Sequence, residues 1–319
     1  MEKRNLSLDL IKFIAMIGVI CLHSQNISSP ISHFLYITAV FSIPLFFMSS
    51  GYILLGKTGI NYKYSAKKIF GILRFVIIVT ISYHLLIGIY RDNPLFESTL
   101  GTLLQKGPFS AYWYFGAMII IYALLPLIDY LYREKEKIFF AVTLFLFVIA
   151  NVVFILNFTS GIHVEQNTIQ TFRLWNWLLY FCLGGIIKRY TLKVNWVVVV
   201  MFLLINYIFQ IYTAPKLCSL YCEFFYPSLP TIIFSAVSFI YLINIRIDNK
   251  FIRVVSDLFL PCYTIHGFVI TKTGAIFKSL FSFAGIFTPV LFWIFVCVVS
   301  ISLSWVIMKI PYMNKVFRI

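Results

Sequence analysis

The chain has 319 residues, of which 61% are hydrophobic and only 12% are charged. A soluble protein of this length needs more polar surface to cover its core, so the composition excludes a soluble enzyme and predicts a polytopic membrane protein. The formal net charge is +15, but Lys and Arg gather in short loops between apolar segments, where they act as topology determinants, so we expect no nucleic-acid binding.

Apolar segments of the length needed to cross a bilayer, about 20 residues, divide the chain into about ten expected α-helical spans. In chain order they cover residues 7–25, 34–55, 69–90, 112–131, 138–157, 174–187, 195–213, 229–246, 255–277 and 286–308. The sixth is short. No soluble domain or repeat fits between them, so we expect an all-α fold with a single transmembrane domain over residues 1–319.

The basic residues predict the orientation of these spans. With the N-terminus inside, the inward loops hold most of the 26 Lys and Arg residues. The outward loops hold only Arg91, Lys106, Arg173, Lys216 and Lys278. The positive-inside rule therefore places both termini in the cytoplasm, which requires an even number of spans.

The cysteines fall into two groups. Cys218 and Cys222 share one outward loop and could form a disulfide in an oxidising space, which the sequence leaves open. The other four lie inside predicted spans, where Cys serves as a small buried hydrophobic residue: Cys21, Cys182, Cys262 and Cys297.

The first predicted helix carries three ionisable residues, Asp9, Lys12 and His23. At about 100° and 1.5 Å per residue, Lys12 and His23 differ by about 20° around the helix and about 16 Å along it, and Asp9 lies about 40° from His23. Charges at this depth cost a few kcal/mol unless they face protein or water, so this stripe should line an interior cavity. Alternatively, Asp9 and Lys12 could form an i, i+3 ion pair, Lys12 could snorkel, and His23 could be a hydrogen-bonded residue at the outer interface.

Four motifs in order carry a family resemblance: Lys12 and His23 with ten residues between them, "PLFFMSSGYILL" (44–55), "AYWYFGAMIIIYALLPLI" (111–128) and "LPCYTIHGFVI" (260–270). Together they resemble the acyltransferase-3 family of integral membrane acyltransferases, whose architecture is also ten spans with cytoplasmic termini. The residues at the positions of its patterns are Lys12, His23, Phe46, Phe47, Ser50, Gly51, Tyr52, Trp113, Tyr122, Pro126, Tyr263 and His266.

The sequence departs from the family pattern at two places. Lys12 stands where most members have Arg. Before the third span the family often has Arg-x-x-Arg, whereas this chain reads "KKIFGILRF", with Lys67, Lys68 and then Arg74. Basic character is retained there, but the spacing is not.

The resemblance implies transfer of an acyl group, expected to be acetyl, from acyl-CoA to a hydroxyl of a cell-envelope glycan or its lipid-linked precursor. It implies a bacterial cytoplasmic membrane, with membrane lipids as surroundings and no bound cofactor or metal. His23 would be the general base, because the ordinary imidazole pKa lies near neutral pH. Asp9 and Lys12 would tune or anchor the inner end of the stripe, and His266 is either a second catalytic histidine or a packed polar residue.

Donor and acceptor are expected to approach from opposite faces of the membrane. The donor phosphates would meet basic residues near the inner face, although these residues could equally be positive-inside determinants. The donor-binding candidates are Lys12, Lys67, Lys68, Arg74, Ser50 and Tyr52. The small residues of the "SSG" stretch also favour close helix approach.

The acceptor sugar would meet aromatic residues near the outer face, although the tryptophans among them could instead belong to an interfacial belt. The acceptor-binding candidates are Trp113, Tyr114, Arg173, Trp175 and Tyr263, with Trp177 beside them. Two rival functions stay open: a transporter or flippase of glycan intermediates, and a membrane-embedded sensing or uptake module.

Overall fold

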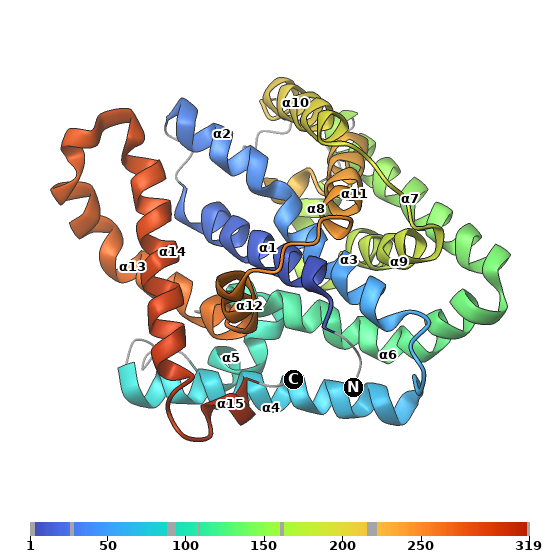
Figure 1. Ribbon diagram of the computed structural model, residues 1–319, viewed down its shortest axis with the longest axis horizontal. Coiled ribbons are helices and arrows are strands. Elements are labelled where there is room, and N and C mark those ends of the chain that lie inside the picture. Colours follow the sequence, from blue (N-terminus) through green and yellow to red (C-terminus); the bar gives the residue numbers. More distant parts are fainter. Residues whose placement is uncertain are drawn as a thin grey trace. The chain divides into compact units, whose positions relative to one another are not determined.

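The computed structural model describes residues 4–25, 29–87, 94–107, 109–159, 163–215 and 222–317. Within these ranges all regular secondary structure is helical (Figure 1). The prediction of an all-α, polytopic membrane protein is confirmed. The sequence-based expectations on Arg91, Lys216 and Cys218 lie outside the described residues, as do the side chains of Cys222 and Lys278.

Each of the ten predicted spans overlaps helix in the described part of the chain. In chain order the long elements are α1 (Leu6–Ser24), α2 (Pro30–Thr38) continued by η1 (Ala39–Phe41) and α3 (Ser42–Leu54), α4 (Tyr62–Ile87), α6 (Trp113–Glu134), α7 (Glu136–Thr159), α9 (Leu174–Tyr190), α10 (Trp196–Thr213), α11 (Leu229–Ile243), α12 (Lys250–Asp257), α13 (Phe259–Leu280) and α14 (Thr288–Ile307). The short elements are α5 (Leu95–Ser98), η2 (Leu100–Leu104), η3 (Ser110–Tyr112), α8 (Val164–Asn167), η4 (Gln170–Phe172), η5 (Cys222–Phe224), η6 (Ser282–Phe287) and α15 (Met313–Val316).

Seven of these helical segments in the described part of the chain are long and apolar enough to cross a bilayer, and α12 with α13 would make an eighth. Helices α9 and α11 lie at the two remaining predicted places, but their 17 and 15 residues fall short of the usual length of about 20. The structure thus supports seven or eight candidate spans, and the count of ten and the orientation stay predictions.

The segment predicted as one span over 255–277 is broken in the structure. Helix α12 ends at Asp257, and α13 continues at an angle of 72°. Pro261 explains the break, because proline has no N–H to donate and its ring clashes with the carbonyl four residues earlier, which here belongs to Asp257. The Tyr263 and His266 motif therefore lies on a helix that begins inside the predicted span.

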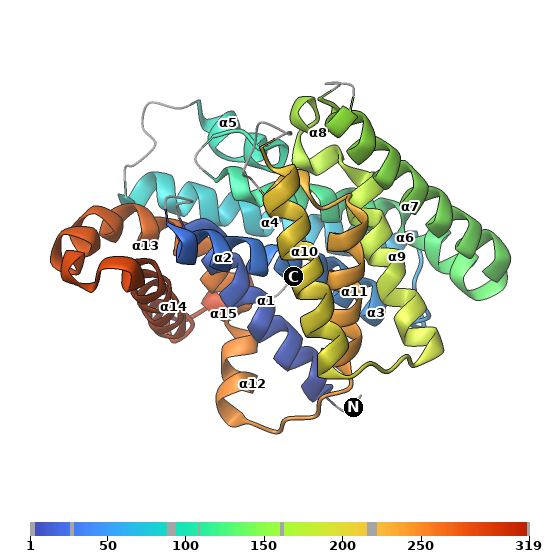
Figure 2. The ribbon, with the colours of Figure 1, turned by 90° about the horizontal axis from the view of Figure 1, so that it is seen from above.

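The chain forms two compact helical units: residues 1–49 with 187–311, and residues 50–186 with 312–319. In the first unit α1 is central, between α11 on one side and α13 and α14 on the other (Figures 1 and 2). Asn5 starts α1, because its side chain accepts hydrogen bonds from the backbone N–H groups of Ser7 and Leu8. The expectation of a single domain over 1–319 stays a prediction.

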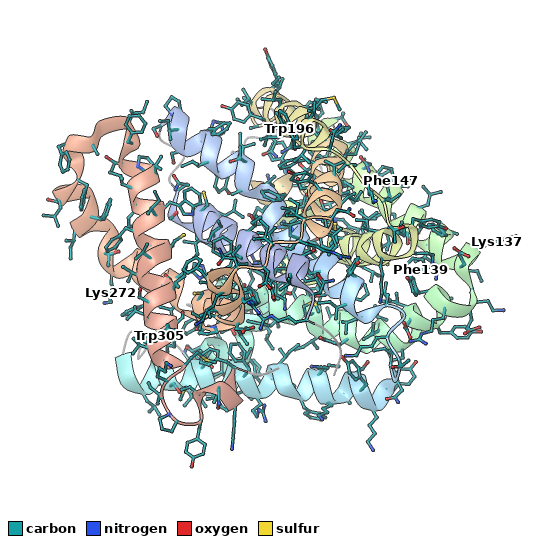
Figure 3. The ribbon with its side chains drawn as sticks, viewed as in Figure 1. Lys137, Phe139, Phe147, Trp196, Lys272 and Trp305 are labelled. Carbon is teal, nitrogen blue, oxygen red and sulfur yellow. The ribbon has the colours of Figure 1, made fainter. Side chains whose placement is uncertain are left out.

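In the second unit α6 is central and packs against α4, α7, η2 and η4. Where α6 meets α7, Phe139 is buried in the unit and Lys137 points away from it (Figure 3). Gly51 brings α3 against α9, because a Cβ there would lie 1.8 Å from the carbonyl oxygen of Phe181. This confirms that the "SSG" stretch provides a close helix approach.

The four cysteines that the sequence places inside spans are free thiols. Cys21, Cys182 and Cys262 are buried, as expected for small hydrophobic residues. Cys297 is only half-buried.

Candidate active site

The structure brings together the two histidines of the sequence motifs. His23, in the last turn of α1, and His266, on α13, have ring centroids 5.1 Å apart, with the ring planes at 42°. Tyr263 lies one turn before His266, and the centroids of these two rings are 5.8 Å apart. Contact between α1 and α13 therefore assembles a His–His–Tyr group from opposite ends of the sequence.

The two imidazoles differ in the exposed fraction of their side chains. His23 is exposed, whereas His266 is 3% exposed. Nδ1 of His266 lies 3.2 Å from the carbonyl oxygen of Cys262. Because a carbonyl can only accept, Nδ1 must carry the hydrogen, which leaves a lone pair on Nε2 of neutral His266. His23 is thus open at the protein surface, while His266 is buried beside it in one tautomer.

Aromatic rings extend this group toward the second motif. Phe259 lies 6.0 Å from Tyr263, and Phe46 lies 4.4 Å from Phe259, measured between ring centroids. We call His23, His266, Tyr263, Phe259 and Phe46 the histidine cluster. It combines residues from three of the four motifs within one unit.

Asp9 has a different partner from the one the sequence suggests. It is buried and accepts hydrogen bonds from Nε of Arg4 at 2.5 Å and from Oγ of Ser256 at 3.0 Å. Arg4 also donates to both carboxylate oxygens of Asp257, each at 3.0 Å, and to the carbonyl of Arg253 at 2.9 Å. These five residues, which we call the Arg4–Asp9 clamp, tie the start of α1 to α12.

The clamp is electrostatically strong and lies far from the histidines. Hydrogen bonds to Asp9 and Asp257 raise the pKa of the Arg4 guanidinium above its already high ordinary value. Asp9 lies about 21 Å along α1 from His23, since 14 residues separate them. Its position therefore suits holding α12, and through it α13, rather than contacting a reacting group.

Lys12 is left without a carboxylate by this arrangement. It is half-buried and, in the described part of the chain, has no hydrogen bond or ion pair. The alternative of an Asp9–Lys12 pair is excluded, because Asp9 binds Arg4 and Ser256. Lys12 is thus a cation on the stripe of His23 that can bind an anion.

The other basic candidates lie on α4, in the second unit. Lys67 and Arg74 are exposed, and their seven-residue spacing places them on one face of the helix. Lys68 is half-buried, with its Nζ 5.9 Å from the ring centroid of Tyr64, and Nζ of Lys57 lies at the same distance from that ring. A basic and aromatic cluster therefore lies at the start of α4.

The second and third motifs meet at another contact in the second unit. The side chains of Ser50 on α3 and Tyr114 on α6 are hydrogen-bonded to each other. Tyr52, two residues beyond Ser50, is half-buried. This pairing of two motif segments could not be read from either segment alone.

The residues around the start of α9 form a buried ion pair. Nη1 of Arg173 lies 3.1 Å from Oε2 of Glu165, and both side chains are buried. Glu165 also accepts hydrogen bonds from Nε1 of Trp175 at 2.6 Å and from Nδ2 of Asn176 at 3.2 Å. The sequence interpretation missed Glu165, although a carboxylate in the outward loop beside Arg173 was a signal for it.

Two of the three tryptophans of this unit, Trp113 and Trp177, lie inside the protein, whereas Trp175 is half-buried. Trp113 and Trp177 have ring centroids 4.8 Å apart and are 7% and 0% exposed, and Nε1 of Trp177 donates to the carbonyl of Gln170. Burial excludes the interfacial-belt alternative for these two. Trp196 and Trp305, labelled in Figure 3, are exposed and better fit a belt.

A second residue that the sequence interpretation missed is Asp129, inside the fourth predicted span. It is buried, accepts a hydrogen bond from the backbone N–H of Gly56 at 2.7 Å and pairs with Nε of Arg133 at 2.8 Å. Arg133 also donates to the carbonyl of Lys57. This network fixes the chain just after the second motif, where Gly56 has a positive φ of 75°.

A family model described as an acyltransferase domain, that of the acyltransferase-3 family, matches residues 5–309. The chain belongs to the acyltransferase-3 family. It is accordingly a membrane acyltransferase, as its motifs predict. Comparisons with curated proteins and with solved structures found no match. Among the described residues, no group of three or more His, Cys, Asp or Glu side chains is placed to hold a metal ion.

Proposed function

We propose that this acyltransferase moves an acyl group, acetyl in the first instance, from acyl-CoA to a hydroxyl of a cell-envelope glycan or its lipid-linked precursor, in a bacterial cytoplasmic membrane. The observation that carries the proposal is the contact between exposed His23 and buried His266 in a member of an acyltransferase family.

His23 acts as the general base. It takes the proton of the acceptor hydroxyl as the oxygen attacks the thioester carbonyl, and a tetrahedral intermediate forms. When this collapses, the carbon–sulfur bond breaks, the acyl group stays on the acceptor oxygen, and the leaving thiolate receives the proton from His23. An imidazole suits both steps because it can accept and return a proton near neutral pH.

His266 orients His23 and shares the charge that develops on it. Its Nδ1 is bound to the Cys262 carbonyl, so the lone pair on Nε2 is the one available toward its neighbours. Tyr263 is in contact with His266 in the histidine cluster, and its ring offers an aromatic face to the acceptor.

Lys12 binds the anionic end of the donor. It lies on the stripe of His23, about 16 Å away along α1, so a donor lying along the helix could place its phosphates at Lys12 and its thioester near His23. Lys67, Lys68 and Arg74, with Ser50 and Tyr52, complete the donor-side candidates.

The acceptor-side residues divide into two kinds. Trp113 and Tyr114 are the candidates for contact with a sugar, together with Tyr263. Arg173 and Trp175 are both bound to Glu165, so they position the start of α9. Arg173 and Trp175 therefore affect acceptor binding indirectly, by holding the start of α9 in place.

Membranes supplied with acetyl-CoA labelled in the acetyl group test the proposal. Label should enter the glycan or lipid-linked fraction with the wild-type protein and with the control His163→Ala, an exposed histidine outside the histidine cluster. With His23→Ala, transfer should fall roughly 100- to 10,000-fold. Full transfer by a normally folded His23→Ala variant would remove His23 as the base, and glycan that is missing rather than unlabelled would indicate transport.

A further inference from the structure

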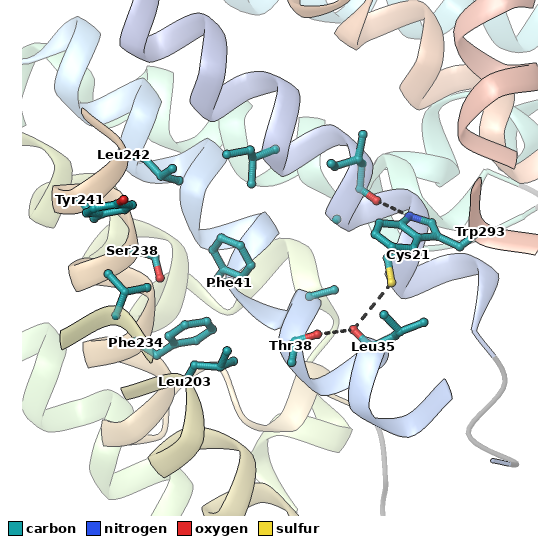
Figure 4. A pocket seen from close by; sticks show the side chains of 15 residues that line it. Cys21, Leu35, Thr38, Phe41, Leu203, Phe234, Ser238, Tyr241, Leu242 and Trp293 are labelled. Atoms are coloured by element: carbon teal, nitrogen blue, oxygen red, sulfur yellow. Dashed lines mark hydrogen bonds between the residues drawn. The ribbon is translucent and has the colours of Figure 1, made fainter. Parts of the chain in front are cut away.

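A cavity of about 350 Å³ lies against α1 in the first unit (Figure 4). On α1 it is lined by Ile14, Ile17, Gly18 and Cys21, which recur with helical spacing. At about 100° per residue, this face is centred about 180° from the stripe of Lys12 and His23. The cavity is therefore distinct from the candidate active site.

The cavity presents apolar atoms. None of its fifteen lining residues is charged. Nε1 of Trp293 donates to the carbonyl of Ile17 at 2.9 Å, and Oγ1 of Thr38 donates to the carbonyl of Leu35 at 3.0 Å, so these polar groups are already satisfied (Figure 4). A buried water needs two to four polar partners, which such walls do not provide.

The hydroxyl of Ser238 differs from these satisfied groups. The buried hydroxyl of Ser238, in the wall formed by α11, has no hydrogen-bond partner in the described part of the chain. The hydroxyls of Ser238 and Tyr241 add two weakly polar spots to a wall that includes Phe41 and Phe234, whose ring centroids are 5.2 Å apart. The wall as a whole stays suited to hydrocarbon.

The cavity borders a surface that faces lipid. Its walls come largely from candidate membrane spans, including α1, α10 and α14. Val199 and Leu203 line it from α10 and are half-exposed, and the next residues on that helix, Val200 and Leu204, are 41% and 50% exposed. The medium at that surface is the hydrocarbon of the bilayer.

We propose that this cavity takes an acyl chain of a bilayer phospholipid. Its volume falls within the usual range of small-molecule sites, about 300–1,000 Å³. A chain inside it would restore the dispersion contacts that a void denies to α1, α10 and α11. This site is independent of the proposed reaction, because it rests on the walls of the cavity and not on the histidine cluster.

The test uses the purified full chain in vesicles of phosphatidylethanolamine and phosphatidylglycerol, with a phospholipid that carries a diazirine in the middle of one acyl chain. After irradiation, mass spectrometry of peptides locates the crosslinks. Phe234 and Leu242 are buried by protein and line the cavity, so we expect them to be labelled at least as strongly as the exposed residues of α10. Only a chain inside the cavity reaches them.

Two neighbouring variants of α10 provide the matched comparison. Leu203→Trp projects a large ring into the cavity and should lower the labelling of Phe234 and Leu242 several-fold. Leu204→Trp places the same ring one residue on, toward lipid, and should leave that labelling unchanged.

Wild-type labelling confined to exposed positions would overturn the proposal, whether or not Leu203→Trp folds. Equal labelling in the two variants would also overturn it. Polyprenyl phosphate provides a second arm. Loss of the crosslinks when it is added in smaller amount than the phospholipid would show that an isoprenoid chain, rather than an acyl chain, is the occupant.

Discussion

The Arg4–Asp9 clamp predicts an unusual pattern of stability among single and double variants. Arg4→Ala leaves the carboxylate of Asp9, whose side chain is 7% exposed, with Ser256 as its remaining partner. Stranding one charge of a buried pair costs about 3–5 kcal/mol. The Arg4 side chain is 42% exposed and partly screened by solvent, so we expect a loss of about 1–3 kcal/mol in the free energy of unfolding.

The second substitution should partly reverse the first. Adding Asp9→Asn to Arg4→Ala removes the stranded charge, so the double variant should be more stable than Arg4→Ala alone. Asp257→Asn is the matched control, because it removes another partner of Arg4 whose side chain is 65% exposed. That control should change the free energy of unfolding by less than about 1 kcal/mol.

The pH dependence follows from the raised pKa of Arg4. A base whose pKa is raised on folding stabilises the fold below its unfolded pKa, and this contribution is lost only as pH rises through the folded value. For Arg4 both values lie above the usable range, so its contribution should stay constant through neutral and moderately alkaline pH.

Thermal unfolding of the purified variants in detergent, followed by intrinsic fluorescence, measures these differences, and acyl transfer measured in parallel reports on His23 and His266. The clamp holds α12, which leads into α13 and its His266. Breaking the clamp in Arg4→Ala should therefore lower kcat, while the donor KM changes little. Equal destabilisation by Arg4→Ala and Asp257→Asn, or strictly additive effects in the double variant, would refute the reasoning.

Three further variants test separate parts of the structure. Lys12→Met should raise the KM for the acyl donor about tenfold, a loss of about 1.4 kcal/mol, and leave the acceptor KM unchanged in steady-state assays. Gly51→Ala should lower the yield of folded protein in size-exclusion chromatography, because its Cβ would lie 1.8 Å from the Phe181 carbonyl oxygen and overpacking costs about 1–3 kcal/mol or more. Glu165→Gln should destabilise the protein in thermal unfolding by about 3–5 kcal/mol, because it removes the carboxylate charge that pairs with the buried guanidinium of Arg173.

Each of these predictions has its own contrary result. A KM that rises equally for donor and acceptor would remove Lys12 from the donor site. Normal folded yield of Gly51→Ala would mean that α3 and α9 can separate at little cost. An unchanged unfolding temperature in Glu165→Gln would show that Arg173 finds another partner, and the positioning role given to the pair would be wrong.

The positions of the helices could be predicted from the sequence because apolar segments of membrane-spanning length are a strong signal. The stripe of Lys12 and His23 was also predictable, since helical periodicity alone fixes their relative angle. The break before α13 could have been found, because Pro261 cannot continue a helix past Asp257. Hydropathy alone does not reveal this break, because apolar residues continue through it.

The partners of these residues could not be predicted by local spacing. Asp9 has Lys12 three residues away, yet it pairs with Arg4 and Ser256, because α12 folds back against the start of α1. The contact between His23 and His266 depends on how α1 packs against α13, and no periodicity in either helix encodes it. The family resemblance singled out both histidines, whereas their contact came from the structure.

The most direct test of the account is mass spectrometry of surface glycans from cells that carry the wild-type protein, its deletion or His23→Ala at matched expression. We expect an added mass, about 42 Da for acetyl, that is present with the wild type and absent from the other two, with glycan length unchanged. An added mass that persists with His23→Ala would contradict the role of His23 as the base, and shortened or missing glycan in the deletion strain would contradict acyl transfer to this acceptor.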